Sequence, residues 1–489
     1  MPMIACERGI GPSVSWVRKS GRVVHWLAFF LLLSSGEIPG QSPVLITLDF
    51  NNPTVEIPHR FSGVSFEMER VLSTGHGEYF FSDRNTRLIA LFKILGIRSL
   101  RVGGNTADRP GIPVPSKADV DQLFAFARAA DVKVIYTFRL RNGNVLEAAD
   151  VASHITSHYD ESLDCFAIGN EPNVFAEEYE EYLSEWWRYV RRIRSSSPES
   201  RFCGPSTTPG KAAWAKQFVA DAGKSGFTKM ITQHAYPGGS GMQVTNPREG
   251  IERMLSRDWV ESYQKFHEAF VPAVDSAGLP FRLEETNNFF HAGAEGVSNT
   301  HAAALWGLDY ALWWATHGAE GLNFHTGDSV AAGENTRPCQ YAVFVTARDG
   351  YSVRPLGYAL KALDIVAHGR IVPVHLDNVE DNYLTAYGTL SDTEELFVTV
   401  INKEVDPGRS RVPVSILAGP DFTSGEVMFL SVKNGDAHAT SGTTLGGSEF
   451  TDDGVWNGTW STVEKDDAGG QFVVKVPSAS AVIVKLKPQ

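Results

Sequence analysis

The stretch "DCFAIGNEPN", residues 164–173, runs from an apolar segment directly into Asn170, Glu171 and Pro172. The apolar part predicts a buried strand, and the polar residues mark the point where this strand opens into a loop. A glutamate at such a position is costly unless a partner or a reaction uses its charge. Glu171 is therefore a candidate functional residue, and we expect its partner on another strand.

Short strand-like runs alternate with longer helical stretches between about residues 60 and 370. The runs are residues 63–68, 99–104, 133–140, 165–172, 201–206, 229–237, 281–287 and 321–327. Eight strands separated by helices are the number that closes a (β/α)8 barrel, also called a TIM barrel. An α/β fold with an open doubly wound sheet is the alternative, although no G-x-G-x-x-G motif follows the first strand.

A long helix is expected in "SNTHAAALWGLDYALWWATHG", residues 298–318. Ser298 is a plausible N-cap and Gly318 a plausible stop, and apolar residues lie on nearly every side between them. Because His301 and Asp309 interrupt the run, it predicts a helix in the protein core rather than one that crosses a membrane.

The sequence pattern changes after about residue 370. From there on, apolar and polar residues alternate in short runs that are separated by turn residues. This pattern predicts an antiparallel β-sandwich. The segment "PVLITLDFNNPTVEIP", residues 43–58, has the same texture and is expected to add an N-terminal strand to that sandwich. We therefore expect a joining strand in 41–60, the catalytic barrel in 61–369 and the C-terminal sandwich in 370–489.

The first 40 residues resemble a secretory signal peptide. Arg18, Lys19 and Arg22 precede the apolar run "VVHWLAFFLLLSSG", with cleavage expected within residues 36–41. A membrane anchor is the alternative, but it needs about 20 apolar residues, and residues 23–33 form a shorter run with His25 inside. The prediction is a secreted, extracellular protein that is not held in a membrane after cleavage.

Composition excludes several classes of partner. Of the 489 residues 43% are hydrophobic, and the formal net charge is −13 without any run of basic residues. This argues against binding to nucleic acid, to anionic membranes and to long polyanions. We expect a monomeric globular protein.

The four cysteines do not define a set of disulfides. Cys6 would leave with the signal peptide, so Cys165, Cys203 and Cys339 remain, which allows one disulfide at most. Cys165 and Cys203 lie in short apolar runs and are expected to be buried free thiols. Their spacing does not fit a metal site, and "NGT" at Asn457 is the one glycosylation sequon.

Polar residues gather where the expected barrel strands end, which is where such barrels carry their function. These residues are Glu67, Asn105, Asn170, Glu171, His234, Tyr236, Glu285 and His325. His234 could equally be a core histidine with its hydrogen bonds satisfied.

Strand alternation suggests which way the glutamates of strand seven point. It puts Leu283 and Glu285 on one face and Arg282 and Glu284 on the other. The simplest arrangement sends Glu285 inward with Glu171, and leaves Glu284 outside in a charge pair with Arg282. Two facing carboxylates about 5–5.5 Å apart can hydrolyse a glycosidic bond with retention of configuration.

The ordered motifs "GVSFEME", "RVGGNTAD", "AIGNEPN", "QHAYP" and "RLEETNNFFHAG" resemble glycoside hydrolase family 79. This family of clan A retaining glycosidases contains β-glucuronidases, including secreted fungal ones, and heparanase. The resemblance spans residues 45–489. It implies hydrolysis of terminal β-linked glucuronic acid, with or without a 4-O-methyl group, by double displacement.

The resemblance implies roles for individual residues. Glu171 would be the acid/base and Glu285 the nucleophile. The sugar would be held by Asn170, at its 2-hydroxyl, and by Glu67, Asn105, His234 and Tyr236.

In the family, the glucuronate carboxylate is held largely by backbone N–H groups of a loop after the nucleophile and by aromatic hydroxyls. The loop here reads "FFHAGAEG", with Phe290 in place of an expected tyrosine, and with His291 and Ala292 where glycines are frequent. We expect the N–H groups of Ala292 and Gly293 to bind the carboxylate, with the Tyr341 hydroxyl as a further donor.

Other activities remain open on the same fold. One is an exo-β-glycosidase for a neutral sugar, and the other is an inactive carbohydrate-binding protein. No cofactor and no metal are expected. The acidic chain and the lack of clustered basic residues favour exo action on a glucuronate-bearing glycan over cleavage within a sulfated polymer.

Overall fold

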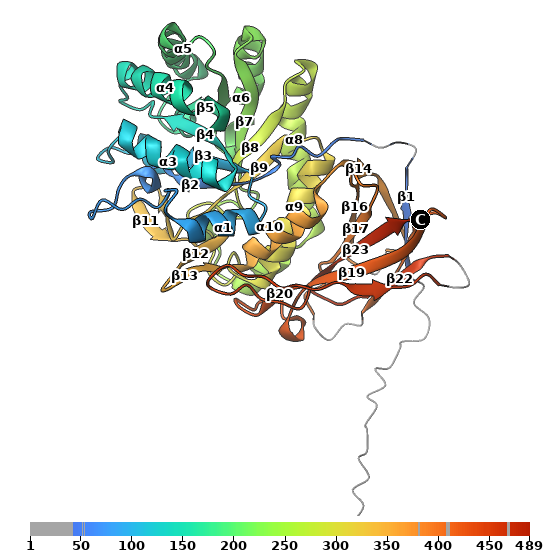
Figure 1. Ribbon diagram of the computed structural model, residues 1–489. Helices are drawn as coiled ribbons and strands as arrows, with labels where there is room; N and C mark the ends of the chain where they lie inside the picture. Colours follow the sequence, from blue (N-terminus) through green and yellow to red (C-terminus); the bar gives the residue numbers. More distant parts are fainter. Residues whose placement is uncertain (1–42, 51, 53, 380–381, 407–410, 467–469) are drawn as a thin grey trace, which may run out of the picture. The chain divides into compact units, whose positions relative to one another are not determined.

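A computed structural model describes residues 43–489 apart from 51, 53, 380–381, 407–410 and 467–469. The expected signal peptide lies outside the described residues. Eight parallel strands close into a barrel in chain order (Figure 1), which confirms the predicted (β/α)8 fold. The strands are β2 (Ser62–Glu67), β3 (Ser99–Gly103), β4 (Lys133–Phe138), β5 (Leu163–Ile168), β6 (Phe202–Pro205), β7 (Thr228–Ala235), β8 (Phe281–Thr286) and β9 (Gly321–His325).

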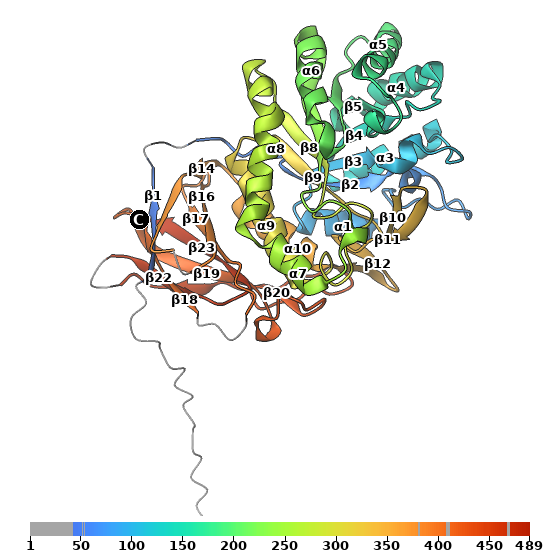
Figure 2. The same cartoon turned by 180° about the vertical axis from the view of Figure 1, so that it is seen from behind.

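Helices follow the strands and surround the barrel (Figures 1 and 2). They are α1 (Thr86–Ile94), α2 (Asn105–Asp108), α3 (Lys117–Ala130), α4 (Val145–Tyr159), α5 (Tyr179–Ser196), α6 (Ala212–Ala222), α7 (Pro247–Met254), α8 (Arg257–Ser276), α9 (His301–Thr316) and α10 (Pro355–Val366). Between β9 and α10 the chain forms two hairpins, β10 (Ser329–Ala332) with β11 (Asn335–Pro338) and β12 (Phe344–Ala347) with β13 (Gly350–Val353).

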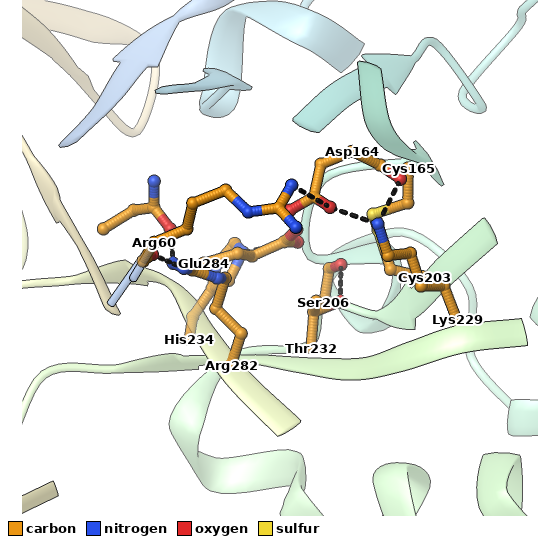
Figure 3. Close-up of a disulfide and its surroundings, with 11 residues drawn as sticks. Arg60, Asp164, Cys165, Cys203, Ser206, Lys229, Thr232, His234, Arg282 and Glu284 are labelled. Atoms are coloured by element: carbon orange, nitrogen blue, oxygen red, sulfur yellow. Dashed lines mark hydrogen bonds and ion pairs between the residues drawn. A yellow bond between two sulfur atoms is a disulfide. The ribbon is translucent and has the colours of Figure 1, made fainter. Parts of the chain in front are cut away.

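Small and apolar side chains fill part of the barrel interior, namely Ile135, Cys165, Ala167, Cys203 and Met230. Cys165 of β5 and Cys203 of β6 are joined by a disulfide (Figure 3). The prediction of two free thiols was therefore wrong. Sequence runs show that both cysteines are buried, but they do not show that adjacent strands bring the two side chains into contact. Cys339 is buried and free.

Two further sheets pack against each other and contain the N-terminal strand, as predicted for the sandwich. One sheet has the order β15 (Val374–Asp377), β1 (Val44–Leu48), β18 (Val412–Leu417) and β22 (Phe472–Val476). The other has the order β14 (Arg370–Val372), β16 (Leu384–Leu390), β17 (Leu396–Asn402), β23 (Ser480–Pro488), β19 (Phe422–Val432) and β20 (Thr443–Leu445), and β21 (Ser461–Val463) also pairs with β19.

Helix α9 is buried along nearly its whole length because it packs on both the barrel and the second sheet. Asp309 on this helix forms a buried ion pair of 2.6 Å with Lys403. The same carboxylate accepts hydrogen bonds from the hydroxyls of Thr385 and Tyr387. This polar cluster ties the helix to the sandwich.

The N-terminus of α9 differs from the prediction. Thr300 is the N-cap, and Ser298 lies in the preceding loop. The Ser298 hydroxyl accepts from the N–H of Ala294 at 2.9 Å and donates to Asn288 at 2.7 Å. Ser298 therefore braces the loop that follows β8 instead of capping the helix.

In the described part of the chain, no helix is both long enough and apolar enough to cross a bilayer.

Replacing Lys403 with methionine should lower the free energy of unfolding by about 3 kcal/mol or more, because it leaves Asp309 buried without its counter-ion. Denaturant unfolding of the two proteins measures the loss. Lys487→Met is the matched control, since Lys487 is 44% exposed and its partner Glu426 also pairs with Lys485. That change should cost less than about 0.5 kcal/mol, and equal losses would contradict the assignment.

Candidate active site

Glu171 does not lie within a strand, because β5 ends at Ile168. The chain then turns through left-handed residues, Gly169 with φ 83° and Glu171 with φ 47°. The Glu171 N–H donates to the carbonyl of Ser206 at 3.0 Å, which fixes the turn. Non-glycine residues rarely adopt this conformation outside functional sites.

Glu284 does not point outward as predicted. β8 shifts register against β7 between Gln233 and His234, and against β9 between Leu283 and Thr286. Leu283 packs into the core outside the barrel, while Arg282 and Glu284 are buried near the disulfide (Figure 3). The expected outer charge pair of Arg282 and Glu284 was therefore wrong. The two residues share a face, as alternation predicts, but that face is the inner one, and the irregularity of β8 at Glu284 lets Glu285 reach the site as well.

Glu285 nevertheless reaches the same site as Glu171. One oxygen of each carboxylate and a ring nitrogen of His234 all lie within 4.8 Å of one another. The Glu171 side chain is 18% exposed and that of Glu285 9%. Both therefore reach the cavity, and Glu171 is the more accessible.

A cavity of about 280 Å³ opens over these two carboxylates. Its walls come from the ends of several barrel strands and from the β10–β11 hairpin. The lining residues are Glu67, Asn105, Glu171, Val174, Thr208, Pro209, Tyr236, Glu285, Phe290, His291, His325, Ala331, Gly333 and Tyr341.

Cationic and polar groups hold Glu285 in its ionised form. Arg101, which is fully buried, donates from Nη1 to Oε2 at 2.5 Å, and the Tyr236 hydroxyl donates to Oε1 at 2.9 Å. His325 Nδ1 lies 3.8 Å from Oε2. Burial opposes ionisation, but the charges of His325, His234 and Arg101 outweigh it and hold the Glu285 pKa well below its usual range.

The sequence reasoning did not find Arg101. The arginine lies within the apolar strand β3, and a charged residue inside such a strand is a signal comparable to Glu171 itself. Arg101 also donates from Nη2 to Asn170 at 2.7 Å. One guanidinium therefore positions both Glu285 and Asn170.

His234 bridges the carboxylates. Its Nδ1 lies 3.0 Å from Glu171 Oε1 and 3.9 Å from Glu285 Oε1, and its Nε2 lies 3.7 Å from Glu284 Oε1. Burial would lower its pKa, but Glu285, Glu171 and Glu284 together raise the pKa of His234 to about 9. His234 is therefore an imidazolium at neutral pH and not a satisfied core histidine.

The remaining predicted sugar contacts lie around the opposite wall. Glu67 accepts from the Thr106 N–H and hydroxyl and from the Ala331 N–H. Asn105 donates to the Ala331 carbonyl at 2.9 Å and accepts from Asn170 at 3.4 Å. These bonds attach the β10–β11 hairpin to the barrel.

The loop after β8 divides two cavities. Phe290, His291 and Tyr341 line the cavity over the carboxylates, whereas Ala292 and Gly293 line a neighbouring cavity of about 420 Å³. His291 borders both cavities, and Arg337 lies on the second. Ala292 nevertheless packs in one buried cluster with Tyr236 and Tyr341, against which Phe290 lies.

Glu171, His234 and Glu285 are the one acidic and histidine cluster of the described residues with the spacing of a metal site. Their ligand atoms already take part in hydrogen bonds with one another, with Tyr236 and with Arg101. A guanidinium at Glu285 also disfavours a second cation there.

Comparison with curated proteins finds two fungal relatives. The chain is 27% identical over 187 residues to a β-glucuronidase of Aspergillus niger and 25% identical over 191 residues to a β-glucuronidase of Neurospora crassa. The alignments cover 33% and 34% of this chain and about a third, 34%, of each relative. No family model matches the chain.

Solved structures share the fold over nearly the whole chain. A 4-O-α-L-rhamnosyl-β-D-glucuronidase from Fusarium oxysporum aligns with a TM-score of 0.69 at 21% identity, covering 90% of this chain and all of that one. A family 51 arabinofuranosidase from Xanthomonas axonopodis aligns with a TM-score of 0.66 at 14% identity, covering 91% of this chain and all of that one. At these identities the likeness concerns the fold.

Proposed function

We propose that the protein is a retaining, exo-acting β-glucuronidase. The observation that carries this proposal is the carboxylate pair, whose oxygens approach within 4.8 Å over a cavity of about 280 Å³. Such a separation suits direct attack by one carboxylate on the sugar, and leaves no room for the intervening water that an inverting enzyme needs. The curated fungal relatives named as β-glucuronidases support the same chemistry.

Glu285 is the nucleophile in this proposal. It is held ionised by Arg101 and Tyr236, so it can attack the anomeric carbon and form a glycosyl-enzyme intermediate. Glu171 gives its proton to the leaving oxygen in the first step and takes a proton from water in the second. Its greater exposure suits contact with the leaving group and with water.

The other polar groups of the cavity would hold the sugar hydroxyls. Asn170 is oriented by Arg101 and by Asp108, which accepts from the Asn170 N–H at 2.7 Å, so its amide can bind the 2-hydroxyl. Glu67 and Asn105 are braced against the β10–β11 hairpin and can bind hydroxyls further from the reacting carbon. The hairpin closes that wall, which supports release of single terminal sugars.

The glucuronate carboxylate would be bound at the His291 side of the cavity. Tyr341 supplies a hydroxyl there. The N–H groups of Ala292 and Gly293 donate to no other group in the described part of the chain, and both residues line the neighbouring cavity. Because no lysine or arginine is among the residues that line the main cavity, an exo-β-glycosidase for a neutral sugar is the second candidate.

Hydrolysis of nitrophenyl β-glucuronide should exceed that of the matching β-glucoside, β-galactoside and β-xyloside by at least about 100-fold in kcat/KM, because donors placed for a carboxylate are left unpaired by a neutral sugar. Steady-state rates on the four substrates measure this. A preference for any neutral glycoside would replace the proposal with the second candidate.

Glu171→Ala should lose about four powers of ten in kcat/KM on substrates with poor leaving groups, and much less on those with excellent ones. Added azide should restore turnover and give a β-glycosyl azide. Glu285→Ala should lose the first step for every leaving group, and azide rescue should give the α-anomer. Opposite anomers in the two variants would reverse the roles, and an inverting wild type would exclude retention.

Tyr236→Phe should move the acidic limb of the kcat/KM profile to higher pH. The Tyr236 hydroxyl favours the ionised form of Glu285, so its loss raises the Glu285 pKa, and the nucleophile is then protonated earlier as the pH falls. Tyr383→Phe, whose hydroxyl has no hydrogen-bond partner in the described part of the chain, should leave the profile unchanged. An unshifted limb in Tyr236→Phe would show that this bond does not control the nucleophile.

A further inference from the structure

Glu284 has no role in the chemistry described so far, although it is a charged group in the interior of the barrel. Its side chain is fully buried, and neither carboxylate oxygen has a hydrogen-bond partner in the described part of the chain. A carboxylate in such a place costs several kcal/mol unless a charge balances it. Retaining it without hydrogen bonds indicates a function other than stability.

The group that balances Glu284 is His234. Glu284 Oε1 lies 3.7 Å from His234 Nε2, which itself has no hydrogen-bond partner in the described residues. The opposite nitrogen of the ring, Nδ1, lies 3.0 Å from Glu171 Oε1. Figure 3 shows Glu284 and His234 together in the buried region beside the disulfide.

We propose that Glu284 is a positioning residue that acts through His234 on the proton transfer of Glu171. The inference rests on the proposed function, since it takes Glu171 as the acid/base. Glu284 keeps the imidazole charged and keeps its Nε2–H directed into the barrel, so that Nδ1–H is presented to Glu171 in a fixed orientation. It touches neither the substrate nor the reacting atoms.

Other charged groups face this pair, among them the buried guanidinium of Arg282. His234 also faces Glu285, and Glu284 also lies in the field of Arg101, which is hydrogen-bonded to Glu285. Burial raises the Glu284 pKa, but His234 and Arg101 outweigh it and lower the pKa below its usual value. Glu284 is therefore ionised, and removing its charge leaves His234 with Glu171 and Glu285 as its remaining anionic neighbours.

Glu284→Gln tests the proposal because it keeps the shape and removes the charge. Imidazole ¹⁵N titration, assigned by loss of the signal in His234→Asn, should show the pKa of His234 at about 9 in the wild type and at least about one unit lower in Glu284→Gln. The kcat/KM should fall about tenfold or more on an alkyl β-glucuronide, but less than about threefold on nitrophenyl β-glucuronide, since only the poor leaving group depends on the proton of Glu171. Glu268→Gln, an exposed carboxylate on α8, should change neither.

Activity on the two substrates separates this role from a structural one. Glu284→Gln removes one anion from a buried pair with His234, so it should lower the melting temperature, but only the assigned role makes the loss of kcat/KM depend on the leaving group. In the His234→Asn background, Glu284→Gln should cause no further loss on the alkyl substrate. Glu284→Asp, which retains the charge, should keep more of the wild-type titration and activity, and it serves as the test if Glu284→Gln does not fold.

Three results would each overturn the proposal. They are an unchanged pKa of His234 in Glu284→Gln, an equal loss of kcat/KM on both substrates, and a full effect of Glu284→Gln in the His234→Asn background. If the wild type hydrolyses no glucuronide, the proposed function fails, and the titration still decides whether Glu284 controls His234.

Discussion

The structure depends on how the barrel balances four carboxylates that converge at one end of its interior. Glu67, Glu284 and Glu285 are almost entirely buried, and Glu171 lies beside them. Carboxylates that are crowded together in a medium of low polarity repel one another by several kcal/mol. Arg101, His234 and His325 lie among them and offset this repulsion.

The same balance can separate the proposed roles of the two central carboxylates. Glu285 contacts a permanent cation and a tyrosine hydroxyl, which favour its charged form. Glu171 contacts a histidine, whose charge depends on its other neighbours. An attacking group that is always ionised and a proton carrier that is adjustable are what double displacement requires.

Much of the fold could be predicted from the sequence, because strand and helix patterns are local properties. All eight barrel strands and the joining strand β1 were found in this way. Features that depend on contacts between strands could not be predicted in this way. The register shift in β8 separates Glu285 from the face of Leu283, against the alternation rule, and the Cys165–Cys203 disulfide depends on the pairing of β5 with β6. Likewise, Glu171 and Glu285 were found because both lie near the carboxyl end of a strand pattern, whereas Arg101 was missed because it lies inside one.

The central claim is that Glu285 becomes covalently attached to the sugar. Incubation with 2-deoxy-2-fluoro-β-glucuronyl fluoride should inactivate the protein. The 2-fluorine slows both formation and hydrolysis of the intermediate, but the fluoride leaving group speeds formation, so the intermediate accumulates. Mass spectrometry of the digested protein should then find one glycosyl adduct, on the peptide that contains Glu285. An adduct on Glu171 or Glu284, or turnover without any adduct, would contradict the account.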